Sequence, residues 1–259
     1  MKWFLIVFCV AGIVQSSPIV SQNRSILLSV DPTQPSGELG YYHEGDMMLT
    51  YSQQIEFKNI NKNWTGTLES KYQWPNKTIA FDFEGTWYTE ETQRFYYAIM
   101  DIAAKTCIKF VRRTNQTNYI MVTTAESNCF SDFGFVPGIR IINLGHECFN
   151  SIGTIQHQIL HSLGLFHTHT AYNRDEYITI KNIDDYYYKS YLEINYENSR
   201  FGLPYDYNSV MHFKETAFAY YGSPSIEPKE KGVKIGQRKL LSDIDSQLIN
   251  RMYSCPYGQ

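Results

Sequence analysis

Three segments between residues 78 and 144 have the apolar and polar pattern of β-strands. In 78–83, large apolar residues alternate with smaller or polar ones: Ile79, Phe81 and Phe83 against Ala80 and Asp82. The runs 119–124 and 139–144 are apolar and rich in strand-forming residues. We therefore expect these three segments to be strands of one sheet.

Helical spacing of apolar residues comes between and after these strands. The segment 90–107 places four apolar residues on one side of a helix: Phe95, Ile99, Ile102 and Ala103. We expect further helices at 151–163 and at 184–196, a tyrosine-rich segment whose rings pack and solubilise a helix rather than bind a cofactor. Ser242 and Asp245 form a capping pair for a last helix whose apolar side is made of Ile244, Leu248, Ile249 and Met252. The mixture predicts an α+β fold, with a cleft between an upper half of sheet and helices and an irregular lower half.

The first residues of the 259-residue chain have the pattern of a secretory signal peptide. The apolar run 3–14 is too short to span a bilayer, and small residues that suit a cleavage site follow it. We assign 1–16 to the signal peptide and the polar, irregular segment 17–64 to a propeptide. The remainder, 65–259, has the size of one catalytic domain, and secretion is favoured over membrane attachment.

The charge balance excludes two classes of partner. A net charge of −3 and a pI near 6.2 provide no electrostatic footprint for nucleic acid or for an anionic membrane. The sequence also lacks a glycine-rich phosphate loop, a repeat and a low-complexity tract. We therefore expect the partner to be a secreted protein or peptide, and the chain to be a monomer.

Cysteines and sequons agree with export. Cys9 leaves with the signal peptide, and four of the five cysteines remain, at positions 107, 129, 148 and 255. An even number in a secreted chain predicts two disulfides, for which three pairings are possible. The candidate glycosylation sites are the sequons that begin at Asn23, Asn63, Asn76 and Asn115.

The segment 157–167 has the spacing of a three-histidine metal site. His157 and His161 stand one turn apart on the same face of a helix, and Gly164 supplies an exit that lets the chain return His167 as a third ligand. Three imidazoles with a fourth position open are typical of a catalytic zinc site, not a structural one. In the hydrolytic form of this motif, the residue after the first histidine is a Glu that accepts a proton from the attacking water. Here it is Gln158, whose amide cannot accept one.

Three other histidines lie near this set in the sequence or in the predicted fold. His169 competes with His167 for the third ligand position, but the offset and the glycine turn favour His167, and we expect His169 to be exposed. We interpret His146 and His212 as structural histidines, with His212 supporting the loop that it lies in.

Several further segments match one family. The segment 205–213, with Met211, resembles the Met-turn that runs beneath the metal in metzincins. Within that group the chain resembles the astacin family, over about 71–256, through the segments 173–178, 224–228, 235–238 and 241–245 in addition to the histidines and the Met-turn. The resemblance implies a metzincin zinc-metallopeptidase domain with one Zn²⁺ per chain. It also implies the disulfides Cys107–Cys255 and Cys129–Cys148.

The chain departs from the family at four positions along one mechanistic path. Gln158 replaces the general base, and Phe213 replaces the tyrosine that ligates zinc at rest and stabilises the oxyanion. Thr168 stands where a Glu would receive the new N-terminus of a mature enzyme, which here would begin near Thr65. Trp64 stands where an Arg is usual before the cut. We expect Phe213 to pack in the core and the metal site to survive without most of its chemistry.

The propeptide keeps one element of the family. His43, Glu44, Gly45 and Asp46 are similar to the F-x-G-D element by which astacin propeptides place an aspartate on the zinc, although His43 replaces the aromatic residue. The alternative is that Gly45 and Asp46 form an ordinary turn. We expect Asp46 to be the blocking ligand.

These observations leave three hypotheses for the function. The first is a secreted, zinc-binding astacin-like pseudoprotease that binds peptides, substrates or protease regulators in its cleft. The second is a slow zinc endopeptidase that cleaves secreted proteins, and the third is a structural domain without metal.

Overall fold

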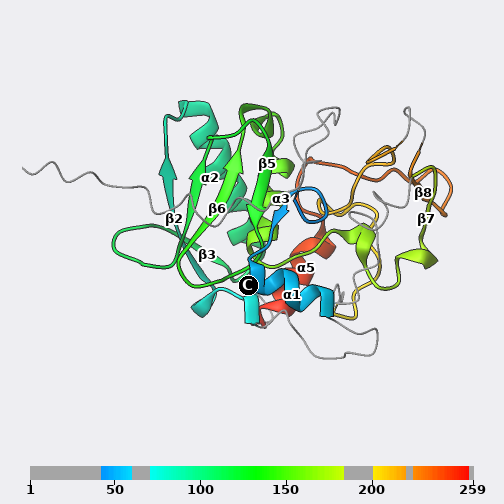
Figure 1. Ribbon diagram of the computed structural model, residues 1–259, viewed down its shortest axis with the longest axis horizontal. Helices are drawn as coiled ribbons and strands as arrows, with labels where there is room; N and C mark the ends of the chain where they lie inside the picture. The colour runs from blue at the N-terminus through cyan, green and yellow to red at the C-terminus, as the bar shows by residue number, and fades with distance from the viewer. Residues whose placement is uncertain (1–41, 60–70, 184–200, 220–223, 257–259) are drawn as a thin grey trace, which may run out of the picture. The chain divides into compact units, whose positions relative to one another are not determined.

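The structure is a computed structural model that describes residues 42–59, 71–183, 201–219 and 224–256, all of which belong to one compact unit (Figure 1). Several predictions lie outside the described residues: the signal peptide, the tyrosine-rich helix, Trp64, and the sequons at Asn23 and Asn63. None of the described helices has the length and apolarity needed to cross a bilayer.

Six strands form the main sheet, in the order β1-β5-β6-β4-β2-β3. Their bounds are β1 Met47–Met48, β2 Thr78–Glu84, β3 Lys109–Arg112, β4 Tyr119–Thr123, β5 Cys129–Asp132 and β6 Ile139–Leu144. Strands β5 and β6 are antiparallel, and all the other neighbouring pairs in this sheet are parallel. The three strands predicted from the sequence are confirmed as neighbours in this sheet.

Helices α2 (Thr89–Lys105) and α3 (Ile152–Ser162) pack against each other and share the main core with the sheet (Figure 1). The apolar side of α2 buries Phe95, Ala98, Ile99 and Ile102. The prediction for Ala103 was wrong, because this residue is exposed. It lies roughly 90° around the helix from the middle of that apolar stripe.

The last helix, α5 (Asp243–Met252), begins as predicted. The Ser242 hydroxyl accepts a hydrogen bond from the Asp245 amide at 2.9 Å, and the Asp245 carboxylate accepts one from the Ser242 amide at 3.1 Å. Leu248, Ile249 and Met252 are buried, while Ile244 packs at the edge of the core.

Short elements complete the described part of the chain. The 3₁₀ turns are η2 Pro75–Lys77, η3 His146–Asn150, η4 Thr168–Thr170 and η5 Arg174–Glu176, and a second sheet pairs β7 Ile178–Ile180 with β8 Ile226–Pro228. Both disulfides implied by the family resemblance are present, Cys107–Cys255 and Cys129–Cys148, with Cα–Cα distances of 5.5 and 5.9 Å. The α+β class is confirmed.

The propeptide assigned to 17–64 is not irregular where the structure describes it. Strand β1 extends the main sheet at the edge of β5, and helix α1 (Tyr51–Asn59) follows it. Thr50 caps the start of α1 by exchanging two hydrogen bonds with Gln53. The Gln53 backbone amide donates to Thr50 Oγ1 at 3.3 Å, and the Gln53 side-chain oxygen accepts from the Thr50 backbone amide at 2.8 Å. A free sheet edge at β5 and a local Thr-x-x-Gln capping box therefore explain the order in this segment.

Candidate metal centre

Helix α3 ends in a backbone motif that returns the chain toward its own histidines. The Leu165 amide donates to the Leu160 carbonyl at 3.0 Å and the Gly164 amide to the His161 carbonyl at 2.9 Å, which is the Schellman arrangement. Gly164 has a φ of +98°, and a Cβ there would lie 3.0 Å from Met252 Cε. A glycine is therefore required at this turn, and the turn positions His167 opposite the helix.

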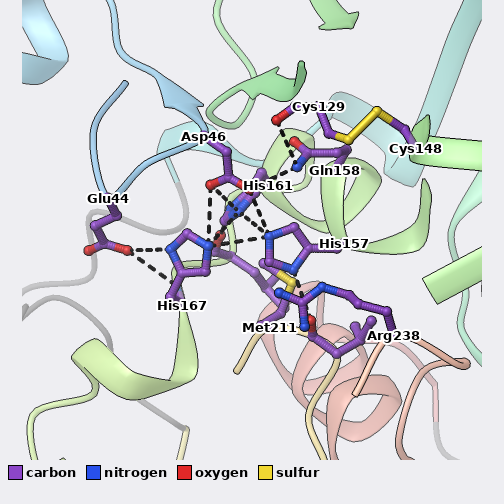
Figure 2. A network of polar contacts seen from close by, with 12 residues as sticks. Glu44, Asp46, Cys129, Cys148, His157, Gln158, His161, His167, Met211 and Arg238 are labelled. Atoms are coloured by element: carbon purple, nitrogen blue, oxygen red, sulfur yellow. Dashed lines mark hydrogen bonds and ion pairs between the residues drawn. A yellow bond between two sulfur atoms is a disulfide. The ribbon is translucent and has the colours of Figure 1, made fainter. Parts of the chain in front are cut away.

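The three predicted histidines meet at their Nε2 atoms, and all three side chains are fully buried. The Nε2–Nε2 distances are 3.1 Å from His157 to His161, 3.2 Å from His161 to His167, and 3.3 Å from His167 to His157 (Figure 2). Each Nδ1 lies near an oxygen. His157 Nδ1 is 2.8 Å from the Val210 carbonyl oxygen, His161 Nδ1 is 2.8 Å from that of Leu165, and His167 Nδ1 is 2.9 Å from Glu44 Oε2. Oxygens at the Nδ1 atoms fix the tautomers, so that the Nε2 lone pairs converge.

Asp46, which directly precedes β1, closes this site. Its Oδ2 lies 2.9 Å from His157 Nε2, and its Oδ1 lies 3.3 Å from the Nε2 atoms of His161 and His167. Asp46 is fully buried, and its Oδ1 has no hydrogen-bond donor among the described residues. Three imidazole nitrogens and a carboxylate oxygen thus face one another, an arrangement that a bound metal cation would satisfy.

The electrostatics of the site point the same way. Burial would raise the pKa of the Asp46 carboxyl, but the three surrounding imidazoles hold it well below its ordinary value. Burial lowers the pKa of His167, but the carboxylates of Asp46 and Glu44 outweigh burial and raise it to about 9. Positive charge is therefore favoured here. The four ligand atoms all lie within 4.8 Å of one another, and three imidazoles with one carboxylate are a donor set that fits Zn²⁺.

The predicted Met-turn lies against these histidines. Met211 is buried, and its carbonyl accepts a hydrogen bond from the Thr168 amide at 3.0 Å. In Figure 2, Met211 and Asp46 are on opposite sides of the imidazoles. The turn is held from α5, because the Asp245 carboxylate accepts from Ser209 Oγ at 2.6 Å and from the Val210 amide at 2.8 Å.

A comparison with known families decides the classification. The family model described as "Astacin", a peptidase family, matches residues 66–254. The chain belongs to the astacin family. The match covers the histidines, the Met-turn and α5, and it begins downstream of Asp46.

Individual relatives agree with this assignment. Zinc metalloproteinase nas-7 of Caenorhabditis elegans is 34% identical over 187 residues, which cover 71% of this chain but 48% of the relative, so the chain spans about half of that protein's length. Zinc metalloproteinase nas-4 of the same organism is 32% identical over 245 residues, covering 91% of this chain and 74% of the relative. That share is larger than 66–259 can supply, so the similarity extends upstream of residue 66. High choriolytic enzyme 1, a hatching enzyme zinc-protease from the medaka fish Oryzias latipes, has a similar structure, with a TM-score of 0.66, 31% identity, and coverage of 76% of this chain and 100% of that chain.

Gln158, the residue predicted to replace the general base, lies beside Asp46. Its Nε2 donates to Asp46 Oδ2 at 2.8 Å and is 3.4 Å from the Cys129 carbonyl oxygen (Figure 2). The side chain is fully buried and contacts Asp46, the carboxylate that faces the three histidines.

Phe213 packs in the core, as predicted. Its ring centroid is 4.2 Å from that of His167 and 4.2 Å from that of His169, on which it stacks. The prediction that His169 is exposed was wrong, because this histidine is fully buried. The stacking on Phe213 gives the physical reason, and it depends on a residue 44 positions away that no local pattern reveals.

The remaining predicted positions are also found in definite environments. Thr168, in the place of the family's Glu, is buried and donates to Ser209 Oγ at 2.9 Å. His146 is 2.6 Å from Glu91 Oε1, and His212 Nε2 is 2.7 Å from the Tyr205 hydroxyl, so both are structural histidines with partners. The sequons at Asn76 and Asn115 begin at exposed residues.

Sequence reasoning missed one residue of the site. Glu44 is buried, and its Oε2 accepts from the His167 backbone amide at 3.4 Å in addition to its contact with His167 Nδ1. It therefore orients the third histidine from the segment that precedes β1. The signal was its place inside the F-x-G-D-like element, but only the docked segment brings it to a histidine 123 residues away.

Proposed function

We propose that this protein is a secreted, zinc-binding member of the astacin family that has lost most or all peptidase activity and binds peptides, protease substrates or protease regulators in its cleft. The observation that carries the proposal is the amide of Gln158 at the base position, within hydrogen-bond distance of an aspartate that faces the metal ligands. The expected partner is a secreted protein or peptide, with no role for nucleic acid or membrane, and the expected state is a monomer.

The residues around the metal position account for the loss. When bound, Zn²⁺ supplies a Lewis acid that polarises a carbonyl and lowers the pKa of water. Gln158 has no titratable group and cannot hold the proton, and removing a general base costs about 100- to 10,000-fold in rate. The Phe213 ring carries no hydroxyl to donate to an oxyanion, and losing one such donor costs about 100- to 1,000-fold. The two effects are not additive, but together they remove most of the chemistry.

The family's route of activation is altered as well. The buried hydroxyl of Thr168 offers no negative charge to a new N-terminus, and Trp64 replaces the basic residue before the expected cut. Asp46 would then serve as the zinc-blocking residue of a propeptide that lacks the usual Arg before its cut. These features favour a site that stays masked until the segment is displaced.

Secretion is supported by the apolar run 3–14 and by the two disulfides. Disulfides persist in oxidising compartments and are rare in the cytosol. The exposed sequons at Asn76 and Asn115 are compatible with glycosylation during export.

A slow but active zinc endopeptidase is the alternative. The observation that favours it is the intact convergence of His157, His161 and His167, which needs neither Gln158 nor Phe213 to hold a metal. A structural domain without metal is disfavoured by the buried, converging lone pairs.

The test is an assay of the purified chain after forced removal of residues up to 64. Quenched-fluorescence peptides are incubated with the zinc-loaded protein, with and without a chelator, beside elemental analysis of the same sample. The proposal predicts one zinc per chain and no chelator-sensitive turnover. Chelator-sensitive turnover near that of an active astacin would refute it, and the absence of zinc would instead favour the structural domain.

A further inference from the structure

We propose that Tyr72, Phe133 and Phe166 form a binding site for a helical peptide, separate from the metal ligands, and that helix α1 occupies it as its ligand. The proposal rests on the proposed function in one respect, which is that the segment ending near residue 64 masks the metal. It goes further because it gives this segment a second point of attachment that needs no zinc. A cut after residue 64 would then leave the segment bound and the metal masked.

The walls of this site are held by contacts that do not involve α1. The rings of Phe133 and Phe166 stack with their centroids 4.4 Å apart, and the Tyr72 ring centroid lies 6.0 Å from that of Phe133. The Phe135 amide donates to the Tyr72 carbonyl at 2.7 Å, and the Gly134 amide donates to a carbonyl of α3 at 2.9 Å. These backbone hydrogen bonds hold the end of β5 against its neighbours whether or not α1 is bound.

Phe57 is the apolar anchor of α1. Its ring centroid lies 5.6 Å from that of Phe133, 5.5 Å from that of Phe166 and 6.1 Å from that of Tyr72, each time in an edge-to-face arrangement. Aromatic pairs in this geometry are attracted by more than the area that they bury. The cluster therefore favours an aromatic side chain at this position of the helix.

Two polar side chains of α1 fix how the helix lies on the cluster. Gln53 is buried, and its Nε2 donates to the Phe133 carbonyl at 3.0 Å. The Glu56 carboxylate accepts from the Tyr72 hydroxyl at 2.6 Å and from Lys71 Nζ at 2.7 Å. Hydrogen bonds to a charged acceptor are among the stronger ones in proteins, so these contacts add selectivity to the aromatic packing.

The helix presents these three residues on one face. Gln53, Glu56 and Phe57 are spaced i, i+3 and i+4, which brings them to the same side, whereas Tyr51 and Ile55 lie on the other side and are 76% and 43% exposed. A helix of nine residues is marginally stable by itself in water, so the order of α1 depends on its docked face. The ligand class is a short helix that carries Gln, Glu and Phe at this spacing.

The α1 site and the metal site are joined in sequence but differ in chemistry. Asp46 faces the histidines, and α1 begins five positions later, at Tyr51. The contacts of Gln53, Glu56 and Phe57 given above are made to aromatic rings, a carbonyl, a hydroxyl and an ammonium group, not to the metal ligands. Because the connection is short, the loss of one attachment leaves the other at a high effective concentration.

The test follows the upstream piece after a cut in the full chain. A recognition sequence for a site-specific protease is inserted after residue 64, and the affinity between the two pieces is measured by dilution and gel filtration, zinc-loaded and after chelation. The proposal predicts that the pieces stay together in both conditions. Release of the upstream piece by chelation would overturn it.

Phe57→Ala tests the aromatic anchor in the cut, chelated protein. It should weaken the affinity between the pieces about 10- to 100-fold, because the edge-to-face contacts and their buried area are lost. Tyr51→Ala is the matched control, since it removes an aromatic ring from the exposed side of the same helix, and it should change the affinity by less than about threefold. Equal effects of the two variants would overturn the proposal.

A double-mutant cycle separates a direct contact from general loosening. Tyr72→Phe removes one hydroxyl from the site and should weaken the affinity about 3- to 10-fold, but it should have no further effect when Glu56→Ala is already present. Fully additive effects would overturn the assignment of Tyr72 to the site. Because affinity is measured without zinc and no hydrolysis is followed, an active parent enzyme would refute the proposed function without altering these results.

Discussion

Asp245 connects helix α5 to the Met-turn and, one step further, to the first histidine. Its carboxylate accepts from Ser209 Oγ and from the Val210 amide, and the Val210 carbonyl lies 2.8 Å from His157 Nδ1. Asp245→Ala removes the shared acceptor and leaves both donors buried. It also removes half of the capping box with Ser242.

The size of the effect follows from these contacts. Two hydrogen bonds to a charged acceptor contribute about 1.5–3 kcal/mol each, and the helix cap about 1 kcal/mol. Allowing for non-additivity, we expect a loss of about 3–5 kcal/mol in the free energy of unfolding. Zinc affinity should fall about 10- to 100-fold, because His157 loses a fixed orientation. The control is Asp243→Ala in the same helical turn, an exposed residue whose helix-dipole contribution is only about 0.3–1 kcal/mol.

Urea unfolding of the metal-free protein measures the first quantity, and competition with a chromophoric chelator measures the second. A free energy for Asp245→Ala within about 1 kcal/mol of that for Asp243→Ala would refute the reasoning about stability. If Asp245→Ala lowers the free energy of unfolding by the expected amount but binds zinc as tightly as the parent, the turn does not orient His157.

Three further predictions concern ligands, disulfides and pH. His161→Ala should abolish stoichiometric zinc binding in elemental analysis, whereas His169→Ala, which removes a buried ring outside the ligand set, should retain one zinc per chain; equal loss in both would contradict the ligand assignment. On the chain-entropy model, opening the Cys107–Cys255 disulfide should lower the free energy of unfolding by about 5 kcal/mol, and opening Cys129–Cys148, which closes a shorter loop, by about 3 kcal/mol. The reverse order of urea midpoints would argue against that model. Burial raises the pKa of Asp245. The folded protein therefore loses stability as the pH rises from the ordinary pKa of an aspartate through the raised pKa of Asp245. Asp245→Asn should flatten the plot of unfolding free energy against pH in that acid window, and an unchanged slope would contradict the shift.

The elements fixed by local patterns were predicted well. The period of α3 and the glycine after it located three ligands, and the pair Ser242 and Asp245 located the start of α5. Each of these signals lies within a few residues of the feature that it predicts. The family resemblance then supplied the disulfide pairing, for which the sequence pattern alone left three possibilities.

The misses at Glu44, His169 and strand β1 share one physical cause, which is contact between distant segments. Glu44 reaches His167, and Phe213 covers His169, only after the segment that precedes β1 and the Met-turn have docked. Strand β1 is two residues long and exists because β5 offers a free edge. The capping box at Thr50 was readable from the sequence, but the apolar positions of α1 give no clear helical stripe beside it.

The central claim is that a complete zinc site has been retained without the groups that hydrolyse peptides. The most direct measurement compares the parent with the double variant Gln158→Glu, Phe213→Tyr, each freed of residues up to 64, zinc-loaded and assayed on the same peptide substrates. The account predicts one zinc per chain in both proteins, no measurable turnover by the parent, and chelator-sensitive turnover by the double variant. Turnover by the parent equal to that of the double variant would contradict it.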